Sequence, residues 1–357
     1  MTWLFAAVGF MALVVLHEAG HFAAAKAVGM RVEKFSLFFG PMLVKWRRGE
    51  TVYGVGPIPL GGYVKISGMN PYEELPPEVA HRAYFRQPVW KRIVVILAGP
   101  GVNLLIAFVL LWGILSIHGS EKLGVDAIEP GSPAAGALQP KDRLLSVDGH
   151  ATQDATKIAS LIGDHTCTGK PSAGCRATTP VHLVVLRDGK RVSLTLTPRY
   201  DTKLKRMRLG FAFGGVPVRQ NVVSAAGQSI TAMWDMTSAT VSRIGSLLFS
   251  AQARKDVHGV VGGYEATRQA VSLGFAEGLS LIAGVSLALG IVNLFPFLPL
   301  DGGHVLWALI EKVRGRSVPF WVMERAGFVG FALVILLAVV GFTNDLNTLQ
   351  HGGNFLR

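Results

Sequence analysis

Two histidines and a glutamate interrupt the first apolar segment of the chain, in the string "LHEAGHFAAA". At about 100° per residue, helix geometry places His17 and His21 one turn apart on one face, with Glu18 beside them. Two imidazoles at this spacing can bind one zinc ion, and the neighbouring carboxylate can reach a water molecule on that ion. The alternative is a pair of hydrogen-bonded histidines at a helix interface, which leaves the glutamate unexplained. The string therefore predicts a metal site with a general base.

A catalytic zinc site needs a third protein ligand and one open position. The apolar segments offer Asp301, with His304 close behind it, in the string "NLFPFLPLDGGH". A carboxylate at membrane depth costs about 2.5–3.5 kcal/mol on insertion scales, so Asp301 needs a partner, and zinc would supply one. We expect His17, His21 and Asp301 to hold one Zn²⁺ per chain. The role of His304 stays open between a group that orients a ligand, a surplus ligand and an interfacial residue.

The same string contains two prolines and an amide that bear on the site. Pro296 and Pro299 prevent a regular helix between Asn293 and Asp301, leaving free carbonyls and a local bend. Asn293 is an amide in an apolar segment. It serves either as a hydrogen-bonding contact between helices or, as we favour, as a group that positions the substrate backbone or the developing oxyanion.

The composition points to an integral membrane protein. Half of the 357 residues are hydrophobic and only 16 % are charged, which is too apolar for an ordinary soluble domain. The segments long enough to span a bilayer are roughly 3–25, 93–117, 279–300 and 326–342. These four spans exclude a soluble secreted metalloprotease. The first segment lacks a positive n-region, so we interpret it as a retained span and not as a signal peptide.

The Lys and Arg residues cluster in segments between the spans, and this distribution indicates how the chain is oriented in the membrane. Residues 26–92 carry eleven Lys or Arg against five Glu, and a second basic cluster lies between the last two spans, at Lys312, Arg314, Arg316 and Arg325. Under the positive-inside rule these segments are cytoplasmic, so the active site lies toward the cytoplasm and residues 118–275 lie outside it. The net charge of +12 then indicates contact with anionic lipid, and we expect no nucleic-acid partner.

The predicted fold is a polytopic α-helical membrane protein of about four spans, with a membrane-associated β-hairpin and an inserted β-rich domain. Residues 1–118 and 276–357 form the membrane core, 119–200 the β-rich domain, and 201–275 a linker with an amphipathic helix. The hairpin is predicted at 52–66, where Gly and Pro exclude a helix and Val, Ile and Tyr favour strands. Asp188-Gly189 predicts a second hairpin. Cys167 and Cys175 are either free thiols or, outside the cytoplasm, a disulfide.

These motifs resemble those of the site-2 proteases, the intramembrane zinc metalloproteases. "HEAGH" matches their HExxH motif, and Asn293 to Gly302 matches their NxxPxxPLDG pattern at every fixed position. Gly61, Gly62 and Tyr63 lie in a stretch that looks like the family's membrane-reentrant hairpin, and "GPGVN" looks like the start of its second core helix. The domain at 119–200 looks like the PDZ domain of the bacterial regulator-of-sigma-E proteases. Lys141 stands where such domains usually have Gly, and 164–180 looks inserted.

The resemblance implies an intramembrane endopeptidase of the bacterial inner membrane. Zinc on His17, His21 and Asp301 would lower the pKa of its water to about 7, with Glu18 as the base. Gly61, Gly62 and Tyr63 would position an unwound substrate. The substrates would be single-span membrane proteins, such as anti-sigma factors or remnant signal peptides, already cut by an upstream site-1-type protease, with the PDZ-like domain facing outside.

Two other classes of protein stay open at this stage. A metal transporter would use the His/Asp set as a transit site, but it predicts further acidic or histidine residues along the spans, and the sequence has none there. A scaffold would bind partners through its PDZ-like domain and keep a non-catalytic metal site. Against the scaffold, a structural site needs no base, whereas Glu18 is intact.

Overall fold

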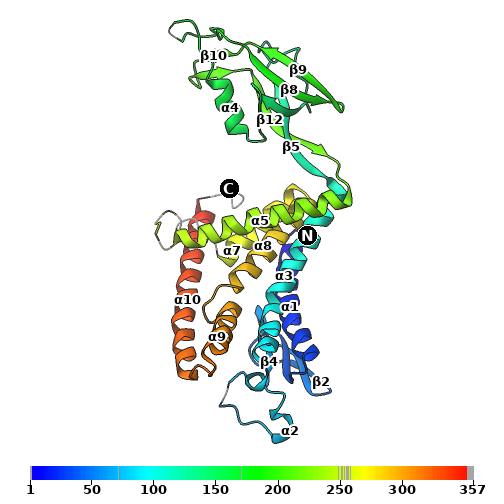
Figure 1. Cartoon of the computed structure of the whole chain (residues 1–357), viewed down its shortest axis with the longest axis vertical. Coiled ribbons are helices and arrows are strands. Elements are labelled where there is room, and N and C mark those ends of the chain that lie inside the picture. The colour runs from blue at the N-terminus through cyan, green and yellow to red at the C-terminus, as the bar shows by residue number, and fades with distance from the viewer. Residues whose placement is uncertain are drawn as a thin grey trace. The chain divides into compact units, whose positions relative to one another are not determined.

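The computed structural model describes residues 2–70, 72–169, 171–247, 249, 250, 252, 254, 257 and 259–351. The chain divides into two compact units, one made of Met1–Ile114 and Ala226–Arg357 and the other of Leu115–Ala225. The first unit contains long apolar helices and a four-stranded sheet, and the second is built mainly of strands (Figure 1).

Four helices of the described chain are long and apolar enough to cross a membrane. They are α1 (Thr2–Ala27), α3 (Val89–His118), α8 (Phe275–Asn293) and α10 (Phe320–Gln350). This confirms the four predicted spans, and the largest changes of boundary are in the third and fourth. The third helix stops at Asn293 because the prolines that follow break it. The fourth extends beyond 326–342 at both ends, since polar turns continue the helix where the apolar pattern stops.

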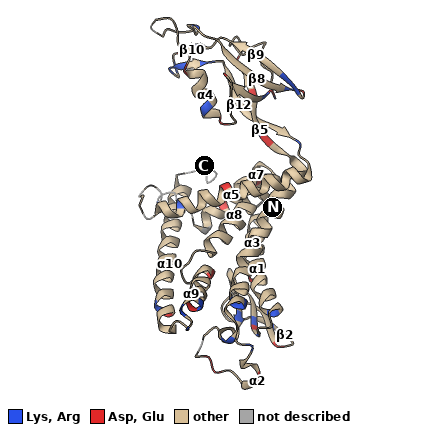
Figure 2. Ribbon diagram, viewed as in Figure 1, with Lys and Arg blue, Asp and Glu red and all other residues tan. Residues whose placement is uncertain are grey.

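The first unit also contains shorter helices and one amphipathic helix. Their bounds are α2 (Pro77–Ala80), η1 (Tyr84–Arg86), α5 (Val222–Leu247), α7 (Val260–Leu273) and α9 (Asp301–Arg314). The start of α5 belongs to the second unit, and the helix lies within 201–275, the segment for which an amphipathic helix is predicted. In Figure 2 the basic residues of the membrane unit gather near β2 and α9, and the middle of α10 carries no charge.

The sheet of the first unit corrects the predicted hairpin. Its strands are β1 (Val32–Phe39), β2 (Val44–Arg48), β3 (Thr51–Val55) and β4 (Ile58–Ile66), in the order β2-β3-β1-β4. Both strands expected within 52–66 are present, but the hairpin pairing was wrong, because β1 lies between β3 and β4 and pairs with each.

A short connection makes this insertion possible. Gly56 and Pro57 carry the chain across the end of β1, where the Gly56 N–H donates to the Leu37 carbonyl at 2.7 Å. A Cβ at Gly56 would collide with the Phe39 carbonyl, so glycine is required at this crossing. Because β4 is the terminal strand of the sheet, its outer edge makes no ladder with any described strand.

In its described residues, the second unit contains a six-stranded sheet, a two-stranded sheet and the helix α4, besides the end of α3 and the start of α5. The elements are β5 (Ser120–Ile128), β6 (Arg143–Val147), β7 (His150–Ala151), α4 (Ala155–Gly163), β8 (Val181–Arg187), β9 (Lys190–Leu196), β10 (Arg199–Asp201), β11 (Arg206–Arg208) and β12 (Phe211–Val218). The large sheet has the order β12-β5-β6-β8-β9, with β7 paired to β6. The hairpin at Asp188-Gly189 is confirmed: these residues have φ of 48° and 77°, as a type I′ turn requires.

Two further features of the second unit bear on predictions from the sequence: the state of its two cysteines and the position of its C-terminal boundary. Cys167 and Cys175 form a disulfide. The unit runs to Ala225, so the predicted boundary at 200 falls too early and residues 201–218 are not a linker. The reason is that β12 pairs with β5 along its whole length, while Phe211 and Phe213 contribute to the core.

Candidate active site

The two histidines of α1 and the aspartate at the start of α9 meet at one point. The Nε2 atoms of His17 and His21 are 3.2 Å apart, and they lie 3.2 and 3.3 Å from Oδ2 of Asp301. Both imidazoles are buried, with 7 % and 8 % of their surface exposed. The three residues expected to bind a metal are therefore brought together, from positions 280 residues apart in the sequence (301 minus 21).

The spacing of these atoms fits a tetrahedral zinc site. Ligand distances of about 2.0–2.1 Å place two ligands of a tetrahedron about 3.3–3.4 Å apart, close to the three separations observed. Oδ2 of Asp301 is buried, and none of the described groups makes a well-aligned hydrogen bond to it, although both Nε2 atoms are near. Three ligand atoms this close together can direct their lone pairs at a common cation. These residues would hold Zn²⁺, and His304 is not part of the three-ligand group.

The opposite nitrogen of each imidazole is held by α3. Nδ1 of His21 donates to the Val95 carbonyl at 2.8 Å, which leaves its Nε2 free to bind a metal. Nδ2 of Asn103 lies 3.3 Å from Nδ1 of His17, and Oδ1 of this fully buried amide has no partner among the described residues. When Nε2 of His17 binds a metal, Nδ1 must carry the proton. Rotation of the Asn103 amide then presents Oδ1 to that proton.

Close packing of α1 on α3 depends on two glycines. A Cβ at Gly99 would lie 2.8 Å from Nε2 of His17 and 2.6 Å from Cε1 of His21, so this glycine gives the two rings the space they occupy. Gly20, inside the histidine motif, faces the Ala98 carbonyl, which would lie 2.6 Å from an added Cβ. The middle of "HEAGH" therefore uses glycine so that the two helices approach closely enough to share the site.

Asp301 is positioned by the break between α8 and α9. The helix α8 ends at Asn293 and α9 begins at Asp301 itself, as the prolines between them predict. On the same helix, the Glu311 carboxylate accepts two hydrogen bonds from the Arg92 guanidinium of α3, at 3.0 and 2.6 Å. Since Arg92 is 4 % exposed, this two-bond pair fixes the direction of α9 and hence of Asp301.

All the residues predicted to act in the site line one cavity of about 490 Å³. They are His17, Glu18, His21, Gly61, Gly62, Tyr63, Asn293, Asp301 and His304. A Cβ at Gly62 would lie 3.3 Å from Cγ of Glu18, so β4 passes directly beside this carboxylate. The cavity thus places the three possible metal ligands, a carboxylate and the free edge of a strand together.

An ion-pair cluster ties the sheet to the end of α1. Glu50, in the turn between β2 and β3, accepts from Arg82 at 2.7 and 2.9 Å and from Lys26 at 2.6 Å. The Arg82 guanidinium, helped by Lys26, lowers the pKa of the Glu50 carboxyl to about 2. The cluster stabilises the sheet against the helix that carries the histidines.

Sequence reasoning missed three contributors to the site: Asn103, Gly99 and the Arg92–Glu311 pair. Gly99 and Asn103 stand in the string "GPGVN" that was noted for its family resemblance, but nothing in that string assigns either residue a role at the metal site. The Arg92–Glu311 pair joins residues 219 apart, and no local pattern indicates it.

Comparison with known proteins agrees with this geometry. The model of peptidase family M50 matches residues 5–337. The metalloprotease MmpA of Caulobacter vibrioides is 31 % identical, covering 94 % of this chain and 92 % of its own. The zinc metalloprotease Rip1 of Mycobacterium tuberculosis is also 31 % identical, covering 86 % and 85 %. The chain therefore belongs to peptidase family M50, the site-2 protease family of zinc metalloproteases, and is a multi-pass membrane protein.

Proposed function

We propose that this metalloprotease hydrolyses peptide bonds within or next to the transmembrane segment of single-span membrane proteins. The observation that carries the proposal is the cavity in which His17, His21 and Asp301 converge beside Glu18, on helices apolar enough to span a bilayer. A hydrolytic site on such helices serves a substrate that is itself in the membrane.

In this proposal each residue of the site has a distinct task. Zinc bound by His17, His21 and Asp301 would supply a water of pKa about 7 and polarise the scissile carbonyl. Glu18 takes the proton from the attacking water and returns it to the amine of the leaving peptide. Asn293 hydrogen-bonds the substrate backbone or the developing oxyanion.

The free edge of β4 gives a means of holding the substrate. A helix keeps its carbonyls in internal hydrogen bonds, so the substrate must unwind before its peptide bond can be attacked. An unwound segment can add to β4 as a further strand, using the backbone groups of Gly61, Gly62 and Tyr63. Because Gly62 approaches Glu18, a strand added here runs past the general base.

We assign the second unit to a PDZ-like domain outside the cytoplasm. A cavity of about 200 Å³ lies between α4 and the strands β11 and β12, lined by apolar residues such as Ile162, Leu209 and Phe213. A groove between a helix and a strand can hold a peptide end. Lys141 has φ of 72°, in keeping with a position that usually carries Gly. The Cys167–Cys175 disulfide supports an oxidising compartment.

The distribution of Lys and Arg that predicts the topology also predicts on which side of the membrane the active site lies. The basic ends of the membrane unit lie in the cytoplasm, so cleavage takes place toward that side of the inner membrane. Substrates are single-span proteins, such as anti-sigma factors or remnant signal peptides, that an upstream protease has already shortened. A phosphatase reporter fused after residue 119 is then active outside the cytoplasm, and one fused after residue 75 is inactive.

Cleavage of a single-span test substrate by the purified protein in detergent tests the proposal. Wild type is compared with Glu18→Gln, each with and without a zinc chelator. Cleavage by wild type alone, lost with chelator and restored by added zinc, supports the assigned roles. Equal cleavage by both proteins removes Glu18 as the base. Zinc content measured in both variants separates a lost base from a lost metal.

A further inference from the structure

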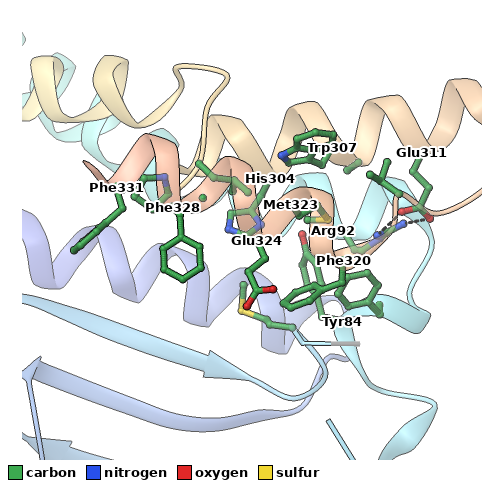
Figure 3. Close-up of a pocket in the computed structure, with 17 residues that line it drawn as sticks. Tyr84, Arg92, His304, Trp307, Glu311, Phe320, Met323, Glu324, Phe328 and Phe331 are labelled. Carbon is green, nitrogen blue, oxygen red and sulfur yellow. Dashed lines mark hydrogen bonds and ion pairs between the residues drawn. The ribbon is translucent and has the colours of Figure 1, made fainter. Parts of the chain in front are cut away.

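Figure 3 shows a second cavity, of about 380 Å³, which shares lining residues with the active-site cavity. It lies between α9, α10 and the segment that contains Met69 and η1. Its walls are mainly apolar and aromatic, and include Tyr84, Trp307, Phe320, Phe328 and Phe331. The hydrolytic steps described above use none of these side chains.

The two cavities are neighbours that share part of their lining. Met69, Pro299 and His304 line both. His304 follows Asp301 by three residues on α9, which is about 4.5 Å along a helix axis. An extended peptide advances about 3.3–3.6 Å per residue. A side chain one or two residues from the scissile bond can therefore reach the second cavity while the bond lies at the metal ligands.

The walls favour an apolar occupant, although Glu324, an exposed carboxylate on α10, also lines the cavity. The far end is closed by the Arg92–Glu311 pair, whose two hydrogen bonds (Figure 3) neutralise both charges. A volume of 380 Å³ exceeds what a small side chain fills, and an aromatic or branched aliphatic side chain buries its surface against the rings at about 25 cal/mol per Å². Burial of this kind gives large apolar side chains an advantage over alanine.

We propose that this cavity is a specificity pocket, which accepts one large apolar side chain of the substrate next to the scissile bond. The inference rests on the proposed proteolytic function. It gives His304 a role as part of the wall shared by the two cavities. It also makes α10, which carries no metal ligand, a determinant of which bond is cut.

The test fills the pocket and measures the change in side-chain preference. Gly327 lines it, and a Cβ added there has Leu298 Cβ, 3.9 Å away, as its nearest heavy atom outside its own helix. Gly327→Leu therefore places a side chain in the pocket without a backbone clash. Ala332→Leu is the matched control, because Ala332 is exposed on the same helix and does not line the cavity.

Each protein is assayed on a single-span substrate in which the two residues on each side of the cut are changed in turn to Ala, Leu, Phe or Trp. For wild type and Ala332→Leu we expect kcat/KM at one position to be at least tenfold higher for Leu or Phe than for Ala. For Gly327→Leu we expect that ratio to fall by tenfold or more, with zinc content and thermal midpoint as in wild type.

Two results overturn the inference. The first is wild-type cleavage that is independent of the side chain at all four positions. The second is a Gly327→Leu variant that keeps the wild-type ratio. If, in this second case, a lipid co-purifies with wild type and is lost from Gly327→Leu, the pocket is assigned to lipid. Failure of the proteolytic function itself is distinct, since wild type then cleaves none of the substrates.

Discussion

Substitution of Gly99 by Ala tests whether the packing of α3 sets the positions of the two imidazoles. The added Cβ would lie 2.8 Å from Nε2 of His17 and 2.6 Å from Cε1 of His21. Favourable contacts need about 3.5 Å, so the rings must move by roughly 0.7 Å or more. Metal sites tolerate errors of about 0.2 Å in ligand distance.

The expected loss follows from this overlap. Overpacking of a buried site costs about 1–3 kcal/mol, and each 1.4 kcal/mol is about a tenfold change in affinity. Gly99→Ala should therefore weaken zinc binding by about 10–100-fold, measured by competition with a chromophoric chelator. Cleavage of the test substrate should fall in parallel at limiting zinc.

The matched control is Gly101→Ala on the same helix. An added Cβ at Gly101 meets no atom of another element within 4 Å, and Ala in place of Gly favours a helix by about 1 kcal/mol. We expect this variant to bind zinc as wild type does and to unfold at a slightly higher temperature. Wild-type zinc affinity in Gly99→Ala would refute the claim that the glycine gives the rings their space.

Three further predictions concern residues around the site. Asn103→Leu should weaken zinc binding by about 10–100-fold. Asn103→Asp should weaken it less, because a carboxylate still accepts a hydrogen bond from His17 Nδ1. Equal zinc affinities for the two variants in the chelator competition would contradict this. Glu50→Gln should lower the free energy of unfolding at pH 7 by about 1 kcal/mol, a value reduced by the 28 % exposure of this side chain. Since the folded-state pKa of Glu50 is lowered to about 2, the wild-type advantage is present above about pH 4.5 and is lost as pH falls toward 2; a thermal-shift difference that is independent of pH would oppose it. Asp345 accepts hydrogen bonds from the N–H groups of Gly259 and Gly262 at 3.0 and 2.7 Å. Asp345→Ala should therefore destabilise the start of α7 by about 1–2 kcal/mol. Hydrogen exchange should become faster at the start of α7 and stay unchanged in α9.

The parts of the site that depend on local spacing were predictable from sequence. One helical turn separates His17 from His21, and a carboxylate in an apolar segment requires a partner, so the meeting of these histidines with Asp301 followed from elementary geometry and energetics. The prolines after Asn293 likewise fixed where α8 ends. Asp188-Gly189 predicted its hairpin because both residues tolerate a positive φ.

The parts that depend on distant pairing were not predictable. The sequence pattern along 52–66 indicates where strands form but not which strands pair. It therefore gives no sign that β1 lies between β3 and β4. The contact of Asn103 with His17 joins residues 86 apart, and an amide alone does not indicate a metal site. Nothing in the local sequence distinguishes Gly99 from another glycine in a helix. Its role is visible only in the structure, where the imidazoles of His17 and His21 lie beside it.

The central claim is that the bond is cut inside the membrane by the base Glu18 at the His17–His21–Asp301 site. The most direct measurement is mass spectrometry of the products from a single-span substrate reconstituted with the protein in liposomes. The account predicts a cut within or at the edge of the substrate's apolar segment, absent in Glu18→Gln although that variant retains zinc. A cut in the aqueous flank, or the same cut by zinc-loaded Glu18→Gln, would contradict it.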